Sequence, residues 1–174
     1  MSKTVTIPSE LNDRLYEALQ GQIHYQIYDC GCVVDYAFET LAYLDLLDVL
    51  GYDTAEWRDE FWNYLVDPSL QRDKAESSIM DRANNYAIGG DEPDPDFKAF
   101  YDTFIAKRNL FDCKESVRDY ALNELGLDTV PDGIDYAEIV KKFTALEGLS
   151  ECSDNDLWFS VIETYFAEIG YGRS

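Results

Sequence analysis

Apolar residues recur along most of the chain at the three- and four-residue spacing of an α-helix, and rarely with the alternation of a strand. The clearest example follows Ser153, where one helical face carries Leu157, Trp158, Val161, Ile162, Tyr165, Phe166 and Ile169. Residues 4–7 alternate briefly and fit a short edge strand. The pattern therefore predicts an all-α fold, a compact bundle of about eight short helices with at most one short N-terminal strand.

Capping residues, prolines and glycines divide this pattern into segments. Asp94 and Ser153 are expected to cap the helices that follow them, and a capping box is expected at Asp53 with Glu56 and at Asp112 with Glu115. The predicted helices cover roughly residues 8–21, 33–50, 53–67, 69–87, 95–111, 112–126, 133–147 and 153–169. Residues 22–32 are expected to link the first two helices. Within residues 33–50 the apolar stripe moves by about half a turn, so that Leu46 and Leu47 are assigned to the apolar face of the second half. That helix is therefore either broken near Leu44 or buried by different neighbours at its two ends.

Domain boundaries are not evident from composition. The clearest loop is residues 89–96, which are rich in Gly, Pro and Asp and could separate two helical lobes. Each lobe would be small, the chain has no internal repeat, and no linker is long enough to separate domains. We therefore expect residues 1–174 to form a single acidic helical domain.

Charge is the feature that departs most from an ordinary globular protein. The chain has 35 Asp and Glu against 14 Lys and Arg, a formal net charge of −21. Self-repulsion on this scale opposes a compact state, so a role in recognition is a natural reason to keep it. Nucleic acid and anionic membranes would repel the chain, and neither is expected as a direct partner. A basic protein surface is the complementary partner.

Basic residues are absent from two long stretches of the chain. No Lys or Arg occurs between Leu15 and Trp57 or between Phe143 and Gly172, although both stretches contain many acids. Acids three or four residues apart on a helix lie on the same face and form a row there. We expect these rows to bind the partner as surrogates for DNA phosphates. The predicted set is Asp35, Glu39, Asp45, Asp48, Asp53, Glu56, Asp59, Glu60, Asp154, Asp156, Glu163 and Glu168.

The amount of charge fits this hypothesis. Duplex DNA carries one charge per roughly 1.7 Å of axis, so 21 charges match about 36 Å of duplex. A compact chain of this length has a diameter of about 40 Å, so charge and size both correspond to about one turn of DNA. Two simpler interpretations stay open: an acidic surface that serves only solubility, and adaptation to salt.

Sequence motifs for catalysis or cofactor binding are absent. The chain contains no Walker loop, dinucleotide fingerprint, HExxH or CxxC motif. A zinc site would need His24, Cys30 and Cys32 together with Cys113 or Cys152, and only a CxC pair supports it. The acids of residues 91–96 lack the ligand order of a calcium-binding EF-hand. We therefore expect free, buried thiols, no metal or cofactor, and no enzymatic activity.

Targeting signals are also absent from the pattern. No stretch approaches the roughly 20 apolar residues of a membrane span, and the first residues lack the apolar core of a signal peptide. A soluble protein of the bacterial host cytoplasm is the expectation.

One segment is similar to part of a known class. Residues 15–19 (LYEAL), followed by residues 22–25 (QIHY) and Asp29, are similar to the first helix and following turn of Ocr-type antirestriction proteins. The rows of acids on helices resemble the wider class of DNA-mimic inhibitors, encoded by phages and other mobile elements, which includes several anti-CRISPR proteins. The resemblance implies a non-catalytic inhibitor that occupies the DNA-binding channel of a restriction enzyme or CRISPR effector. Because the class shares charge layout more than sequence, no individual residue role is transferred.

The leading hypothesis is thus a DNA-mimic inhibitor of a basic DNA- or RNA-handling protein, such as a nuclease complex. The alternative is an immunity-type inhibitor, or another acidic binding module, that recognises one basic protein by shape. An enzyme or metal protein with an unrecognised site is a third reading. Mimicry predicts bands of carboxylates, an immunity protein one compact patch, and an enzyme a concave pocket. A homodimer would extend the acidic surface.

Overall fold

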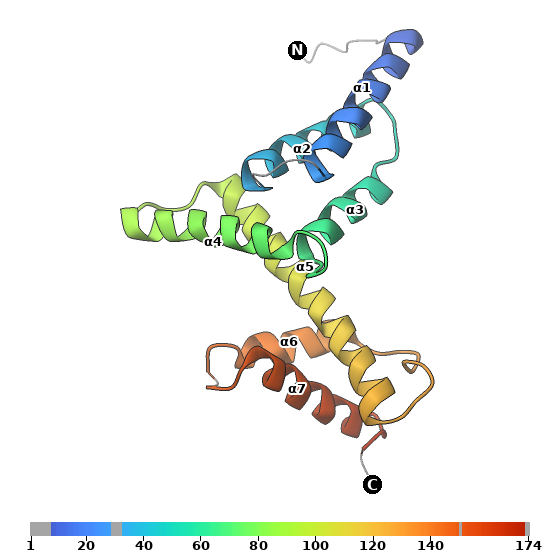
Figure 1. Cartoon of the computed structure of the whole chain (residues 1–174), viewed down its shortest axis with the longest axis vertical. Coiled ribbons are helices and arrows are strands. Elements are labelled where there is room, and N and C mark those ends of the chain that lie inside the picture. Colours follow the sequence, from blue (N-terminus) through green and yellow to red (C-terminus); the bar gives the residue numbers. More distant parts are fainter. Residues whose placement is uncertain (1–7, 29–32, 150, 173–174) are drawn as a thin grey trace, which may run out of the picture. The chain divides into compact units, whose positions relative to one another are not determined.

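The computed structural model describes residues 8–28, 33–149 and 151–172, with the side chains of residues 27–28 and 33–36 excepted (Figure 1). Within these ranges the chain forms seven α-helices and no strand, so the predicted all-α fold is confirmed. The edge strand predicted at residues 4–7 lies outside the described ranges. The helices are α1 (Ser9–Tyr28), α2 (Val33–Val49), α3 (Ala55–Val66), α4 (Arg72–Gly89), α5 (Pro95–Asp119), α6 (Tyr136–Leu146) and α7 (Asp154–Glu168).

Internal contacts divide the chain into two compact units. The first ends at Phe104 and the second begins at Ile105, so the boundary falls inside α5. The loop at residues 89–96 lies within the first unit. The expectation that residues 1–174 act as one domain stays a prediction.

The first unit is organised around the N-terminal part of α5. Phe97, Phe100 and Phe104 lie on one helical face and are all buried. The Phe100 ring lies 5.4 Å from the ring of Phe38 on α2 and 5.4 Å from that of Trp62 on α3, measured between centroids. Three helices therefore share one aromatic core.

Helix α1 is longer than the sequence pattern predicts. It continues through Gly21 to Tyr28, so the prediction of a link at residues 22–32 is wrong for residues 22–28. Ile23 is fully buried, and the buried side-chain carbonyl of Gln26 accepts a hydrogen bond from the Thr40 hydroxyl at 2.9 Å. A glycine within a helix costs only about 1 kcal/mol relative to alanine, and these contacts outweigh that cost.

Helix α2 is continuous, so the break near Leu44 is not observed. In its first half Phe38 meets Phe100 of α5 and Arg82 of α4, and in its second half Asp45 and Asp48 meet Arg58 of α3. The two halves therefore meet different neighbours, as the second of the two sequence-based alternatives states. Leu46, which the pattern assigns to the apolar face, is 42% exposed instead.

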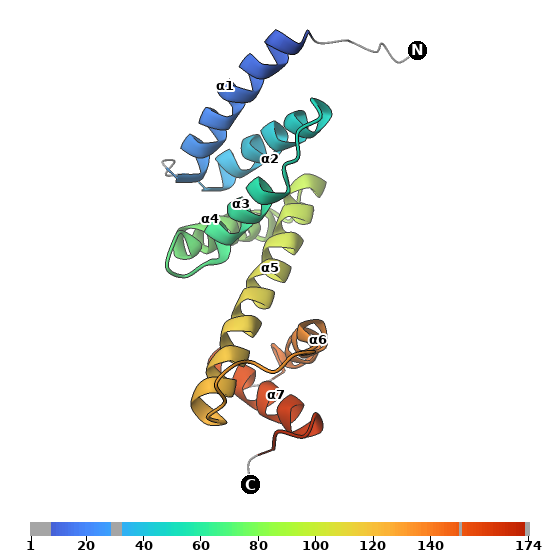
Figure 2. The same cartoon turned by 90° about the vertical axis from the view of Figure 1, so that its right-hand side faces the viewer.

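The second unit contains the rest of α5, a π-helical turn at Tyr120–Glu124, and the adjacent helices α6 and α7 (Figure 2). The predicted boundary between helices at Asp112 is wrong, because α5 runs through it. Cys113 and Val117 are fully buried one helical turn apart, so the apolar face continues across the apparent capping signal. The predicted end at Gly126 agrees with its left-handed backbone, φ +66°.

The core of the second unit is aromatic. The rings of Phe143 on α6 and Trp158 on α7 are stacked with centroids 3.7 Å apart. The Tyr165 hydroxyl accepts a hydrogen bond from the backbone N–H of Asp135 at 2.8 Å. The predicted apolar face of α7 is confirmed except for Ile169, which follows the helix end and is 42% exposed.

Helix caps agree with the sequence pattern in part. Asp94 and Ser153 accept backbone hydrogen bonds at the starts of α5 and α7, as predicted. The capping box expected at Asp53 is not formed. Its carboxylate accepts from the N–H of Ala55, and Thr54 occupies the cap position. Separately, none of the described helices is both long and apolar enough to cross a membrane.

Candidate partner-binding surface

Helix α3 carries three neighbouring carboxylates opposite its buried side. Glu56, Asp59 and Glu60 are all exposed, whereas Phe61 and Leu65 are buried. Residues three and four apart on a helix have Cβ atoms about 5–6 Å apart, so the three carboxylates form one cluster. None of the three forms an ion pair with a described basic side chain. We call Glu56, Asp59 and Glu60 the α3 ridge.

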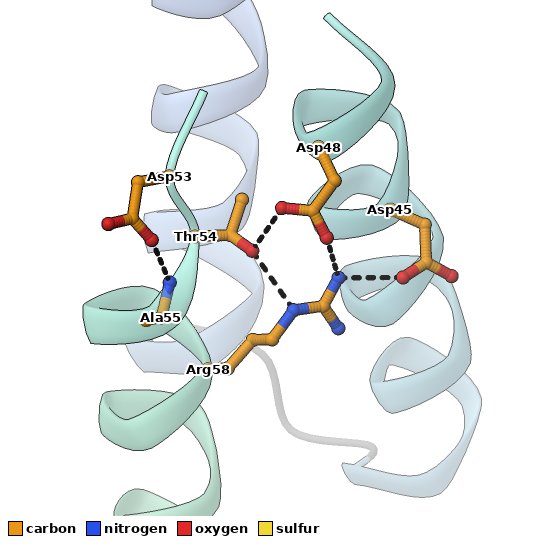
Figure 3. Close-up of polar contacts among 6 residues, drawn as sticks. All are labelled: Asp45, Asp48, Asp53, Thr54, Ala55 and Arg58. Carbon is orange, nitrogen blue, oxygen red and sulfur yellow. Dashed lines mark hydrogen bonds and ion pairs between the residues drawn. The ribbon is translucent and has the colours of Figure 1, made fainter. Parts of the chain in front are cut away.

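A single arginine links the start of α3 to the end of α2 (Figure 3). The Arg58 Nη2 atom lies 2.7 Å from a carboxylate oxygen of Asp45 and 2.7 Å from one of Asp48. Arg58 Nε donates to the Thr54 hydroxyl at 3.0 Å, and that hydroxyl donates to Asp48 at 2.6 Å. These contacts hold two helices and two carboxylates in a fixed arrangement.

The arrangement favours the charged forms of Asp48 and Arg58. Hydrogen bonds from Thr54 and Arg58 hold the pKa of Asp48 below its usual value. Burial opposes the charge of Arg58, but the hydrogen bonds to Asp45 and Asp48 outweigh this effect and raise its pKa. Two predicted phosphate surrogates thus share one positive charge. The α3 ridge on the next helix has no such neutralising partner among the described side chains.

The other predicted acids of the first unit are less closely grouped. Glu39 is exposed and accepts a hydrogen bond from the side-chain amide of Gln26 at 2.7 Å. Asp53 is exposed and stabilises the turn before α3. The side chain of Asp35 lies outside the described part of the structure. The ridge and the Arg58-bound pair are therefore the two clearest groups of acids in the first unit.

The remaining four predicted acids lie on α7, in the second unit. They are Asp154, Asp156, Glu163 and Glu168, and all are exposed. Glu168 forms an ion pair with Lys142 of α6 at 2.8 Å, and its hydrogen bond raises the pKa of Lys142. Asp156 accepts a hydrogen bond from the Ser153 hydroxyl at 2.7 Å, within the helix cap.

The predicted row along α7 is interrupted. Asp156 and Glu163 are seven residues apart, about 10 Å along the axis. Between them lies Phe159, whose side chain is 41% exposed. The α7 acids are thus a separate, sparser surface from the acids of α2 and α3, which belong to the other unit.

Exposed apolar residues accompany the acids of α2. Leu46 is 42% exposed and Val49 is 82% exposed, next in sequence to Asp45 and Asp48. The hydrophobic pattern assigns Leu46 to the core and gives no signal that these side chains are exposed. Apolar groups beside charges are typical of protein interfaces.

The possible metal ligands and the thiols lie partly within the described residues. Across residues 8–28, 33–149 and 151–172 no three His, Cys, Asp or Glu side chains are arranged to hold a metal ion. Cys30 and Cys32, the CxC pair of the zinc alternative, lie outside these ranges. Burial raises the pKa of the Cys113 thiol to about 12, whereas Cys152 is exposed. The expectation of buried thiols therefore applies to Cys113 alone of these two.

Comparison with known proteins does not assign the chain to a family. No family model matches it, and neither a curated protein nor a solved structure matches it either. The similarity of residues 15–29 to Ocr-type proteins stays a prediction.

Proposed function

We propose that this chain is a DNA-mimic inhibitor that binds the DNA-binding surface of a bacterial defence nuclease, either a restriction enzyme or a CRISPR effector. The observation that carries the proposal is the α3 ridge, formed by Glu56, Asp59 and Glu60, which are exposed and lack described ion-pair partners. The carboxylates of this helix carry the same negative charge as DNA phosphates, so a cationic groove that normally binds DNA would attract them.

The density of charge supports the comparison with DNA. Glu56 and Glu60 are four residues apart, about 6 Å along the α3 axis. The ridge therefore places three charges in about 6 Å, within a factor of two of the one charge per roughly 1.7 Å of duplex DNA. Arginines and lysines spaced for phosphates could contact several of these carboxylates at once.

Arg58 contributes by organising two further predicted acids, Asp45 and Asp48 of α2. It holds Asp45 and Asp48 at 2.7 Å each, while the Asp45 side chain stays 71% exposed. Carboxylates already held in place lose less side-chain freedom on binding. Long-range attraction to a basic partner also speeds association, and this effect falls as salt is added.

The test is inhibition by the intact chain and by a ridge variant. The chain is expressed in bacteria that carry restriction or CRISPR systems, and the plating of unmodified phage is counted. Purified chain is also added to the corresponding DNA-cleavage reactions. We expect the Glu56→Lys/Asp59→Lys/Glu60→Lys variant to inhibit more than about 100-fold less well, because like charges placed together cost several kcal/mol.

A matched variant separates position from net charge. Asp81→Lys/Asp91→Lys/Glu92→Lys reverses three exposed acids elsewhere in the first unit and changes the net charge equally. We expect this control to keep most of the inhibition. Equal loss in both variants would reject the ridge as the binding site. Failure of the unmodified chain to inhibit any of the restriction enzymes and CRISPR effectors would reject the proposal.

The exposed apolar residues of α2 favour a second candidate, an immunity-type inhibitor that recognises one basic protein by shape. Leu46 and Val49 could act as apolar contacts inside a charged surface. The Leu46→Ser/Val49→Ser variant changes no charge. If it loses binding while the ridge variant keeps it, shape recognition is favoured over mimicry. The reverse result favours mimicry.

A further inference from the structure

The second unit contains a cavity that none of the predicted acids explains. Its volume is about 340 Å³, and it lies between α7 and a face formed by the end of α5 and the π-helical turn. Ligand pockets range from about 300 to 1,000 Å³, so this one suits a small ligand or a single side chain. All of its lining residues belong to one unit.

The aromatic part of the lining is held by packing. Tyr120 and Trp158 are buried, and Phe159 is 41% exposed. The Tyr120 ring lies 5.4 Å from the Phe159 ring and 5.2 Å from that of Phe166, and Trp158 stacks on Phe143. The partly exposed ring of Phe159 therefore packs against the Tyr120 ring before any ligand binds.

The polar part of the lining is acidic. Asp119 and Glu124 line the cavity from the side of α5 and the π-helical turn, and no Lys or Arg is among the described residues that line it. Asn123 of the π-helical turn and Asn155 of α7 also line it. Carboxylate and amide side chains thus share the lining with aromatic rings.

The backbone beside the cavity is unusual. At the end of α5 the N–H of Leu125 donates to the carbonyl of Tyr120 at 3.1 Å, five residues back instead of the four of an α-helix. Such π-helical turns are rare and occur often at functional sites. This turn includes Asn123 and Glu124, both of which line the cavity.

We infer that this pocket binds a guanidinium group. The guanidinium is a planar cation with five N–H donors, which suits carboxylate and amide oxygens around its edge. Its flat face stacks on aromatic rings, and Phe159 offers one at the cavity. An ammonium group has three donors and no plane, so it uses this lining less well.

The start of α7 does not oppose a cation here. A helix N-terminus carries partial positive charge, and Asn155 lies in the first turn of α7. That turn also contains Asp154 and Asp156, whose charges offset the helix dipole. Arg118, which precedes Asp119 in the sequence, is not among the residues that line the cavity.

Two sources could supply the guanidinium: a free small molecule, or an arginine side chain of a protein partner. The inference does not rest on the α3 ridge, because the pocket lies in the other unit. Loss of the ridge-dependent inhibition would leave the pocket intact. Loss of guanidinium binding would likewise leave the ridge proposal standing.

The test is a titration of the full chain with N-acetyl-arginine N-methylamide, followed by NMR. We expect saturable shifts in the side-chain amides of Asn123 and Asn155, with a dissociation constant on the order of 1 mM. The matched citrulline compound, which is neutral, should not bind, and the lysine compound should bind more weakly. Absence of saturable shifts, or equal binding of the citrulline or lysine compound, would overturn the inference.

Variants place the binding in the pocket. Asp119→Asn removes one charge with little change of shape and should weaken binding about tenfold. Phe159→Leu keeps an apolar side chain but removes the ring, and it should also weaken binding. Asp132→Asn removes a charge from an exposed residue of the same unit outside the lining and should change nothing. Equal weakening by Asp119→Asn and Asp132→Asn would mean a general charge effect and would overturn the inference.

Two probes then identify the source. Agmatine carries the guanidinium as a free small molecule, and a Gly-Arg-Gly peptide with blocked ends carries it in a chain. Tighter binding of agmatine indicates a small-molecule site. Tighter binding of the peptide indicates an arginine of a protein partner. Both results support the pocket, and failure of both probes to bind would overturn it.

Discussion

Arg58 and the acids around it show that the role of a charged residue depends on its neighbours in the fold. Asp45 and Asp48 are as acidic in the sequence as the residues of the α3 ridge, but they share one guanidinium at 2.7 Å. The ridge residues have no comparable partner in the described ranges. At the scale of residues, the acids therefore divide into carboxylates held by Arg58 and carboxylates without an ion pair to a described side chain.

The lowered pKa of Asp48 predicts a pH dependence of stability. A carboxyl whose pKa is lower in the folded chain stabilises it above the unfolded value, near 3.8, and this contribution is lost as pH falls through the lower folded value. We expect Asp48→Asn to lower the urea midpoint at pH 7. The difference from the unmodified chain should shrink below pH 3.8. A difference that is constant from pH 7 to the acid limit would contradict this.

At the scale of elements, helix length follows burial more than local punctuation. Helix α1 continues through Gly21 because Ile23 and Gln26 are buried beyond it. Helix α5 continues through Asp112 because Cys113 and Val117 are buried beyond it. A capping residue marks a helix end where no buried face continues past it. Asp135 is an example, because its side chain accepts a hydrogen bond from the N–H of Glu138 at the start of α6.

Two glycine substitutions of opposite sign test this description. Gly21 lies in a helix with open space around its Cβ position, so Gly21→Ala should stabilise the chain by about 0.5–1 kcal/mol. Gly126 has φ +66°, so Gly126→Ala should destabilise it by about 1–2 kcal/mol. Urea unfolding of both variants measures the two changes. Destabilisation by Gly21→Ala would mean that α1 ends near residue 21.

At the scale of the whole molecule, the net charge has two opposite effects, one on the folded state and one on association with a basic protein. A formal charge of −21 repels itself in the folded chain, while it attracts a basic partner from a distance. Each unit has its own acidic surface, on α2 and α3 in the first and on α7 in the second.

Salt should separate these two effects. Raising the ionic strength from 0.01 M to 0.15 M shortens the Debye length from about 30 Å to about 8 Å. We expect the urea midpoint of the chain to rise over this range, because self-repulsion is screened. Association with a basic partner should slow over the same range. A midpoint that falls with salt would show that attractive pairs, such as those of Arg58, outweigh repulsion.

The sequence by itself determined the features that depend on near neighbours. The all-α class, the caps at Asp94 and Ser153, and the buried face of α7 follow from helical spacing and from side chains that reach backbone groups a few residues away. The abundance and rough location of acids are likewise visible in the sequence. Glu56, Asp59 and Glu60 are clustered and exposed on one helical face.

Only the tertiary structure decided which charges and apolar groups are used within the fold. Arg58 meets Asp45, thirteen residues away, because α2 and α3 come together there. The exposure of Leu46 depends on which side of α2 its neighbours cover. The pocket beside Phe159 combines α5, a π-helical turn and α7. These features arise from contacts between elements, whose geometry depends on packing of the whole core and not on local spacing.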